Sequence, residues 1–341
     1  MHALTRRDFG RLAVAAAAPV RLQPATARRY AYIHLDVFTE RRYEGNQLLT
    51  FLHPDGLDTD AMQTMTRESN YSECTFVFPP DRPGTEYRVR IFTRTAETPF
   101  AGHPTIGTAF ALAHGGVIKP GTSKTVFGLG VGPTPIDLEW DGARLKFAWM
   151  TQLAPTFGKT VTDAAALARA IGLEPSALAL DRAPAQEVHT GSTFFIVPIA
   201  TRKAVDAAVL DRAKIDAVFT SAGIQRRGVY ICSTEAAQDG STAYSRLLSA
   251  GGIEDPATGS AAGPAGAYLI KHELVPSILS KDIVFLQGVL VRRPSRIHVH
   301  VEATTSGMVG SNTPPTRQVN VTSVKVGGPA VVVGEGSMTL G

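Results

Sequence analysis

One short motif occurs twice in this chain, and the repeat constrains the fold more than any other feature. "PTIGTA" at Pro104–Ala109 and "PATGSA" at Pro256–Ala261 share the pattern Pro-x-x-Gly-Ser/Thr-Ala and lie 152 positions apart. In both halves a strand-like segment precedes the motif, and an alanine-rich segment with almost no charge follows it. We therefore expect a duplicated α/β architecture in which each sheet wraps around one helix that is buried on all sides.

The order of expected strands and helices in the two halves supports this duplication. The first half reads as strand-rich, with helices over 58–70, capped by Asp58 or Thr59, and over 105–114. The second half begins after a crossing at Pro155–Gly158 and predicts helices over 162–182 and 202–223 before its own motif. Apolar strands then close the chain and complete the sheets.

The first 27 residues have the layout of an export signal. A basic start with adjacent Arg6 and Arg7 precedes a short apolar stretch, which ends in Ala25-Thr26-Ala27. We expect cleavage after Ala27, use of the twin-arginine export machinery, and a periplasmic or secreted protein. If this segment is not a functional signal, the protein is expected in the cytoplasm. Two domains, at 28–150 and 151–341, would follow, with the last strands able to return to the first domain.

Charge and hydropathy exclude several classes of protein. The expected signal holds four arginines and one aspartate, so its removal lowers the formal net charge from +4 to +1, and we predict no nucleic-acid binding. No apolar run reaches the roughly 18 residues that a membrane span needs, so stable membrane insertion is not expected.

Sulfur and metal chemistry have little support. Cys74 and Cys232 lack the spacing of a redox or zinc motif, although one bridge between them stays open beside the more common fate of burial. His298, His300 and Glu302 alternate along one strand, but a solvent-facing polar side explains them better than a metal site. We therefore predict no metal.

Each motif places a helix start where an anion can bind. The first backbone N–H groups of a helix have no partner within it, and the helix dipole favours negative charge there. If the two halves face each other, N–H groups around Gly102, Gly259 and Ser260 converge on one interdomain cleft. Such a cleft suits a small carboxylated molecule.

Ionisable residues flank both helix starts. His103 lies in the first, Glu254 and Asp255 open the second, and Glu73 precedes an apolar strand that favours desolvation. Proton transfer to carbon needs such groups. The alternatives are an Asp255 that caps its helix and a Glu73 that pairs with a surface arginine.

Three stretches in this order, "NYSECTFVF", "FAGHPTIGTAFAL" and "GIEDPATGSAAGPAGAYL", resemble the phenazine-biosynthesis PhzF-like isomerase family. The resemblance extends from about residue 30 to the end. It implies two diaminopimelate-epimerase-like α/β (α+β) domains, each a barrel-like sheet around a central apolar helix, in a cofactor-free isomerase that is usually a homodimer.

The same resemblance implies roles for individual residues. Glu73 corresponds to the glutamate that moves a proton between ring carbons of trans-2,3-dihydro-3-hydroxyanthranilate. His103 and Asp255 correspond to residues that contact polar groups of the substrate, and Gly259 and Ser260 lie at its carboxylate.

Departures from the family pattern leave the substrate open. This chain has Gln47 where relatives usually have proline, Tyr71 and Cys74 beside Glu73, and Arg292 in place of glycine. Because two of these residues flank Glu73, we expect a reshaped pocket.

Two rival functions remain to be compared. A racemase that uses one cysteine from each half is disfavoured, because neither helix-start loop contains cysteine. The alternative from another class is a non-catalytic exported binding protein for a small anionic metabolite. Retention of Glu73, His103 and Asp255 favours the isomerase, because ligand capture does not require an acid/base carboxylate.

Overall fold

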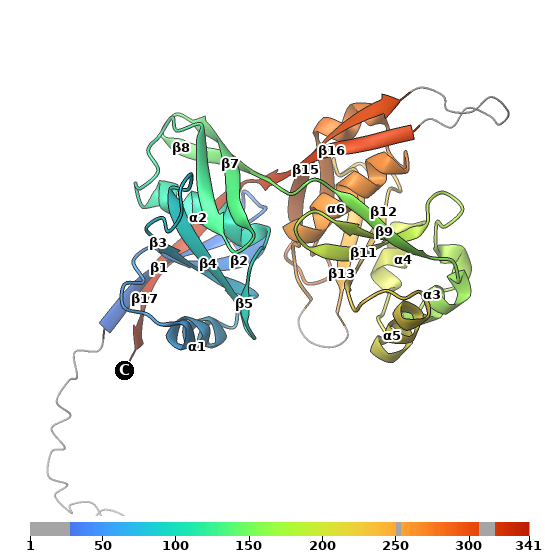
Figure 1. The fold of residues 1–341 in the computed structure, drawn as a ribbon, viewed down its shortest axis with the longest axis horizontal. Coiled ribbons are helices and arrows are strands. Elements are labelled where there is room, and N and C mark those ends of the chain that lie inside the picture. Colours follow the sequence, from blue (N-terminus) through green and yellow to red (C-terminus); the bar gives the residue numbers. More distant parts are fainter. Residues whose placement is uncertain (1–27, 250–253, 307–317, 341) are drawn as a thin grey trace, which may run out of the picture.

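A computed structural model describes residues 28–249, 254–306 and 318–340. Figure 1 shows two lobes side by side, each with strands around a central helix. The expected export signal lies outside the described residues. No helix in the described ranges is long and apolar enough to cross a membrane.

The first half and the C-terminal strand form one lobe. Its elements are β1 (Arg28–Val37), β2 (Asn46–Phe51), α1 (Thr59–Ser69), β3 (Glu73–Phe78), β4 (Tyr87–Thr93), β5 (Glu97–Thr98), α2 (His103–His114), β6 (Lys124–Leu129), β7 (Gly132–Asp141), β8 (Arg144–Thr151) and β17 (Ala330–Leu340). Asp58 caps α1, as the sequence predicts, through a hydrogen bond from the Ala61 N–H to its side chain.

The second lobe contains the elements between β8 and β17 in the sequence. These are β9 (Thr156–Val161), α3 (Ala164–Ala170), η2 (Pro175–Ala177), β10 (Ala185–His189), β11 (Thr193–Pro198), α4 (Arg202–Ala207), α5 (Arg212–Ser221), β12 (Gly228–Ser233), β13 (Ala243–Leu248), α6 (Gly259–Lys271), η3 (Ser277–Lys281), β14 (Ile283–Gln287), β15 (Ser295–Ser306) and β16 (Gln318–Gly328).

The strand order repeats between the two lobes. Pairing runs without a break along β17, β1, β2, β3, β4, β6, β7 and β8, then across to β16, β15, β14, β13, β12, β11, β10 and β9. Within this path β2–β3 and β4–β6 are parallel, as are β11–β12 and β13–β14 at the equivalent places. Each parallel pair needs a crossover, and the second crossover of each lobe carries the motif helix, α2 or α6. The predicted repeat is therefore present in the topology.

Both motif helices are buried, as expected from their lack of charge. Every residue of α2 from His103 to Leu112 is buried, and so is almost every residue of α6 from Gly259 to Ile270. Gly107 permits close packing in the first lobe, because a Cβ there would lie 2.5 Å from Cδ2 of Leu48 in β2.

Two expectations for the start of the second half are wrong in detail. The helix predicted over 162–182 is only α3 and the short η2, because Gly172 adopts a φ of +69° and Pro175 follows it. The crossing predicted at Pro155–Gly158 lies at 152–155, because β9 begins at Thr156 and pairs with β10.

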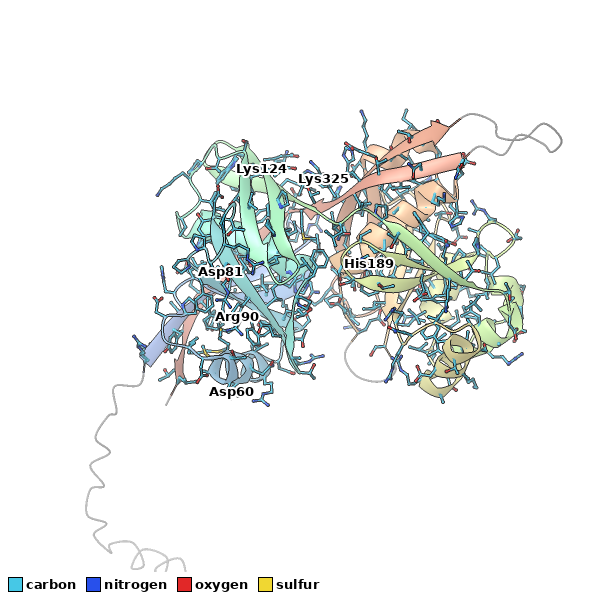
Figure 2. All side chains as sticks on the ribbon, viewed as in Figure 1. Asp60, Asp81, Arg90, Lys124, His189 and Lys325 are labelled. Atoms are coloured by element: carbon cyan, nitrogen blue, oxygen red, sulfur yellow. The ribbon has the colours of Figure 1, made fainter. Side chains whose placement is uncertain are left out.

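The lobes share sheet hydrogen bonds and ion pairs. Lys325–Gly328 of β16 pair with Ala148–Thr151 of β8. Lys325 lies at the junction in Figure 2, and its Nζ is 2.6 Å from Oδ2 of Asp137 in β7. The two lobes are therefore parts of one continuous sheet.

Candidate active site

The two motif helices meet start to start. Gly102 precedes α2, and α6 begins at Gly259. A Cβ on Gly102 would lie 2.5 Å from the backbone N of Ser260 and 2.6 Å from Cα of Gly259. Glycine is required by this close approach, which aims both helix starts at one place.

A cavity of about 240 Å³ lies at this meeting point. All six site residues predicted from the sequence line it: Glu73, Gly102, His103, Asp255, Gly259 and Ser260. The first three come from one lobe and the last three from the other. The cavity is therefore an interlobe cleft, and the other residues that line it include no lysine or arginine.

Glu73 is the first residue of β3. Burial raises its pKa to about 8, and the nearby charge of Asp255 acts in the same direction. The Ser72 hydroxyl and the charge of Arg94 oppose this shift. No arginine forms an ion pair with Glu73 within the described part of the chain, so the alternative of a surface ion pair has no support.

Asp255 faces Glu73 from the second lobe. Burial raises its pKa to about 6, although hydrogen bonds from Thr258 and Asn46 favour the charged form. Thr258 Oγ1 donates to Oδ2 of Asp255 at 2.6 Å, and the Thr258 cap of α6 has no side-chain cap hydrogen bond. Asp255 therefore braces the loop before α6 and does not itself cap the helix. The neighbouring Glu254 pairs with Arg246 at 2.7 Å.

His103 is the first residue of α2 and is only 3% exposed. Its Nε2 lies 3.4 Å from Oε2 of Glu73. Burial lowers the pKa of His103 to about 3, so the imidazole is neutral near pH 7 and the contact is not an ion pair. A neutral imidazole beside a carboxyl group can orient it, but with a pKa of about 3 His103 does not take a proton from Glu73.

Asn46 connects these groups, and sequence reasoning missed it. Its Nδ2 donates to Oδ1 of Asp255 at 2.6 Å and to the carbonyl O of Ala257 at 2.9 Å, and lies 3.1 Å from Nδ1 of His103. Ser72 Oγ donates to Oδ1 of Asn46 at 2.9 Å. The amide orientation follows from these partners, because the reversed amide would place oxygen against carboxylate. The only sequence signal was a turn at Gly45-Asn46.

The remaining walls of the cleft are partly apolar. Phe100, Phe194 and Leu247 line it, with Ser192 and Thr98 beside them. Sequence reasoning missed Phe194 and Leu247 because apolar strand positions resemble ordinary core. The expected reshaping by Tyr71 and Cys74 does not occur by direct lining: Tyr71 stacks on His34 at 5.1 Å between ring centroids, and Cys74 packs in a core under α1.

Neither cysteine takes part in the cleft. Cys74 and Cys232 are buried and unbridged, and burial raises their thiol pKa values to about 11 and about 12. A thiolate is therefore disfavoured at either position.

The side chains of His298 and His300 in β15 are engaged in contacts with neighbouring residues. Nδ1 of His298 lies 2.7 Å from Oδ1 of Asp282, and its ring meets Phe147 edge-on. His300 meets the ring of Trp149. Ile297, Val299 and Val301 are buried, as the alternation predicts, which leaves the histidines on the opposite side of the strand.

Comparison with known proteins gives a consistent result. Residues 35–336 match the family model described as PhzC-PhzF, phenazine biosynthesis-like protein. A Pseudomonas aeruginosa protein named trans-2,3-dihydro-3-hydroxyanthranilate isomerase is 34% identical over 280 residues, covering 80% of this chain and 91% of that protein.

Solved structures agree on the fold. A Bacillus anthracis phenazine biosynthesis protein of the PhzF family superposes with a TM-score of 0.76 at 24% identity, covering 92% of this chain and all of that one. A hydroxyproline epimerase of Agrobacterium vitis gives 0.58 at 12% identity, with 92% and 93% covered. The expected diaminopimelate-epimerase-like fold is confirmed.

Proposed function

Because this chain belongs to the PhzC-PhzF family of phenazine biosynthesis-like proteins and is an isomerase, we propose that it moves a proton between two carbons of a small carboxylated substrate. Glu73 is the general acid/base, and no cofactor is needed. The observation that carries the proposal is the placement of Glu73 beside neutral His103 and Asp255, in a cavity between two helix starts.

One carboxyl group, that of Glu73, both accepts and donates the proton in this reaction. Ionised Glu73 takes a proton from one carbon as the electron pair shifts through the adjacent double bond. Protonated Glu73, whose side chain is partly exposed and can exchange its proton with solvent, then gives a proton to a second carbon, so one C–H bond breaks, one forms, and no electrons leave the substrate. A pKa of about 8 supports this role, because both forms are accessible near neutral pH.

The other predicted residues bind and orient the substrate. Asp255 is largely ionised at pH 7, since its pKa is about 6, and it accepts a hydrogen bond from a polar group of the substrate. His103 contacts the same end. The substrate carboxylate is held by backbone N–H groups at Gly259 and Ser260, with those near Gly102, because the lining supplies no cationic side chain.

The substrate class follows from the size and lining of the cleft. A cavity of about 240 Å³ with Phe100, Phe194 and Leu247 in its walls suits one small ring or short chain with a carboxylate. The substrate in the name of the Pseudomonas aeruginosa relative, trans-2,3-dihydro-3-hydroxyanthranilate, is therefore the first compound to test.

The test combines turnover with binding. Purified protein is incubated with trans-2,3-dihydro-3-hydroxyanthranilate and a panel of cyclic amino and hydroxy acids, and products are followed by proton NMR while calorimetry measures binding. We expect conversion of at least one compound by wild type, and binding without conversion by Glu73→Gln. Glu68→Gln, an exposed carboxylate on α1, is the matched control. A compound that binds wild type and Glu73→Gln equally, with no product from either, favours the exported binding protein.

We also propose export and homodimer formation. The twin-arginine-like start and the Ala25–Ala27 end of the first 27 residues support export, and the resemblance to the family supports the dimer. Cell fractionation of wild type and an Arg6→Lys/Arg7→Lys variant tests the first, with retention of the variant in the cytoplasm expected. Light scattering of the purified protein tests the second.

A further inference from the structure

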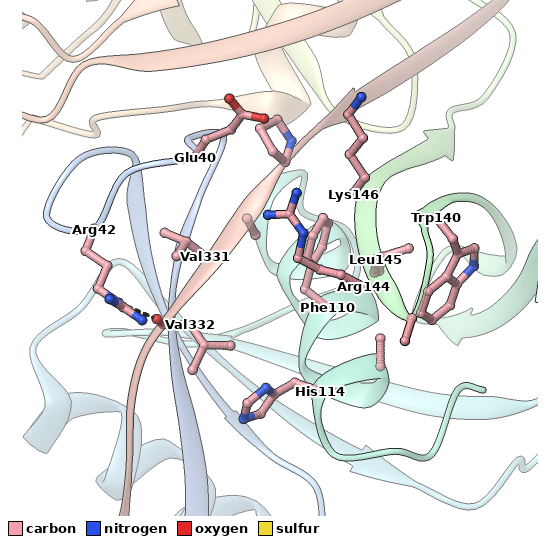
Figure 3. Close-up of a pocket in the computed structure, with 14 residues that line it drawn as sticks. Glu40, Arg42, Phe110, His114, Trp140, Arg144, Leu145, Lys146, Val331 and Val332 are labelled. Carbon is pink, nitrogen blue, oxygen red and sulfur yellow. Dashed lines mark hydrogen bonds between the residues drawn. The ribbon is translucent and has the colours of Figure 1, made fainter. Parts of the chain in front are cut away.

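A second cavity, of about 560 Å³, lies at the other end of α2 from the cleft. The residues that line it share none with the cleft. Figure 3 shows Phe110, Arg144, Leu145, Trp140 and Val331 gathered around it. We call it the seam pocket and define it by Phe110, Trp140, Arg144, Leu145, Lys146 and Val331.

The seam pocket exists because two sheet edges diverge. β17 pairs with β1 along one side, and β8 pairs with β16 only over Ala148–Thr151. Residues 144–147 and 330–332 therefore border a gap that no strand fills within the described part of the chain. The C-terminal end of α2 forms the floor of this gap.

The floor and walls are apolar and partly aromatic. Phe110 and Leu145 are almost fully buried, and Val331 and the ring of Trp140 complete the walls. Nε1 of Trp140 already donates to the carbonyl O of Thr122 at 2.7 Å. Trp140 therefore offers its ring, not its N–H group, to anything in the pocket.

The rim carries an excess of positive charge. Arg42, Arg144 and Lys146 line the pocket against one carboxylate, Glu40. Lys146 has no ion pair or hydrogen bond within the described ranges. Arg144 has only an exposed contact with Asp141 at 3.7 Å. His114, which also lines the pocket, is held by Glu335 at 2.7 Å.

We propose that the seam pocket binds a planar organic anion of the aromatic carboxylate class, separately from the cleft. The ring system lies against Trp140 and Phe110, and the carboxylate faces Arg144 and Lys146. A volume of about 560 Å³ is within the usual range for small-molecule sites, whereas the cleft is smaller. Exposed cations supply orientation and modest affinity.

The test uses 2-naphthoate as the probe and 2-naphthamide as its neutral counterpart. The chain has two tryptophans, so nitrogen-15 labelling gives two indole N–H signals, which Trp149→Phe assigns. We expect 2-naphthoate to shift the Trp140 signal saturably and 2-naphthamide to bind about 10-fold more weakly, because the neutral probe loses both exposed charge contacts.

Variants separate the seam pocket from the cleft and from general charge effects. Arg144→Gln/Lys146→Gln should weaken 2-naphthoate binding about 10-fold, since two charge contacts are lost. The control Lys203→Gln/Arg226→Gln removes the same charge from exposed sites in the second lobe and should not change affinity, and neither should Glu73→Gln. The proposal is overturned if Trp140 does not respond at millimolar probe, if both double variants weaken binding equally, or if Glu73→Gln abolishes it.

Discussion

Glu73 and Asp255 are neighbouring buried carboxyl groups whose pKa values are raised by different amounts, to about 8 and about 6. Burial acts on both, but Asp255 receives hydrogen bonds from Asn46 and Thr258 that favour its charged form. Between these pH values one group holds a proton while the other is ionised. Such a separation keeps Asp255 ionised for substrate binding while Glu73 can carry the transferred proton.

The raised pKa of Glu73 predicts a pH-dependent stability. In the folded state the carboxyl group of Glu73 stays protonated up to about pH 8, whereas its reference pKa, which applies to the unfolded chain, is 4.5. Its contribution to stability is therefore complete below pH 4.5 and is lost as the pH rises through 8. Glu73→Gln does not titrate, so its melting temperature should gain on wild type between pH 5 and pH 9. Thermal unfolding of both proteins checks this, with Glu68→Gln as the control. If the melting temperature of Glu73→Gln instead falls relative to that of wild type as the pH rises, the raised pKa of Glu73 is contradicted.

Asn46→Ala tests the residue that joins the two lobes at the cleft. It removes the amide donated to Asp255 and to the Ala257 carbonyl, which leaves buried acceptors unpaired at a cost of about 1–3 kcal/mol. We expect the pKa of Asp255 to rise and turnover to fall about 10-fold or more. Carbon-13 NMR titration of the aspartate carboxyl groups measures the first effect without substrate.

Ser72→Ala is the milder comparison for Asn46→Ala, because it removes only the hydroxyl that donates to Oδ1 of Asn46. Equal effects of the two variants, or an unchanged titration of Asp255 in Asn46→Ala, would show that Asn46 does not act through Asp255.

At the level of residues, the sequence predicted the site residues that lie in or beside a motif. It missed the site residues that are brought together only by tertiary contacts. Glu73, His103 and Asp255 flank recognisable stretches, and the structure brings them into one cavity. Asn46 is remote in sequence from its partners, 209 positions from Asp255, and local pattern carries no information on that contact. Phe194 and Leu247 resemble core residues until both lobes are assembled.

Among the elements, the contact between the starts of α2 and α6 is the one most sensitive to a single methyl group. Gly102→Ala would place a Cβ 2.5 Å from the backbone N of Ser260, so the helix starts must separate. We expect a loss of activity of about 100-fold, since misplacing a reacting geometry by about 1 Å has this effect.

Gly128→Ala provides the matched control for Gly102→Ala. Gly128 lies in β6, and its added Cβ would meet its nearest neighbours at 3.4 Å, an ordinary contact distance. Turnover and thermal unfolding are measured for both variants. Activity and melting temperature should fall in Gly102→Ala alone. Full activity in Gly102→Ala would show that the two helix starts do not need to touch.

Element boundaries were predicted where composition changes sharply and missed where backbone conformation decides. The uncharged α2 and α6 and the Asp58 cap could be identified from residue types. The break after α3 depends on the positive φ of Gly172 and the proline that follows, which a helix-like run of alanine and leucine conceals.

For the whole molecule, the unbroken path of strands from β17 to β9 predicts one unfolding transition. The first lobe is completed by the last strand of the chain, and β8–β16 pairing joins the lobes. Calorimetry should give equal calorimetric and van 't Hoff enthalpies. Two separate transitions would contradict this coupling.

Gly327→Ala probes the same junction. An added Cβ would lie 2.5 Å from the Trp149 ring and 2.7 Å from the Ala148 carbonyl O, whereas Gly334 in β17 has open space around it. We expect Gly327→Ala to lower the midpoint of the single transition and Gly334→Ala to change it little. A second transition appearing in Gly327→Ala would show that the lobes unfold separately once the junction is weakened.

Deuterium incorporation at a substrate carbon is the most direct test of Glu73 as the group that moves the proton. Wild type, Glu73→Gln and Glu68→Gln are incubated in D₂O with trans-2,3-dihydro-3-hydroxyanthranilate and with each panel compound that binds, and proton NMR follows the loss of each C–H signal. We expect exchange at a substrate carbon with wild type and Glu68→Gln, and none with Glu73→Gln. Exchange at the wild-type rate in Glu73→Gln would contradict the assignment of Glu73 as the group that moves the proton.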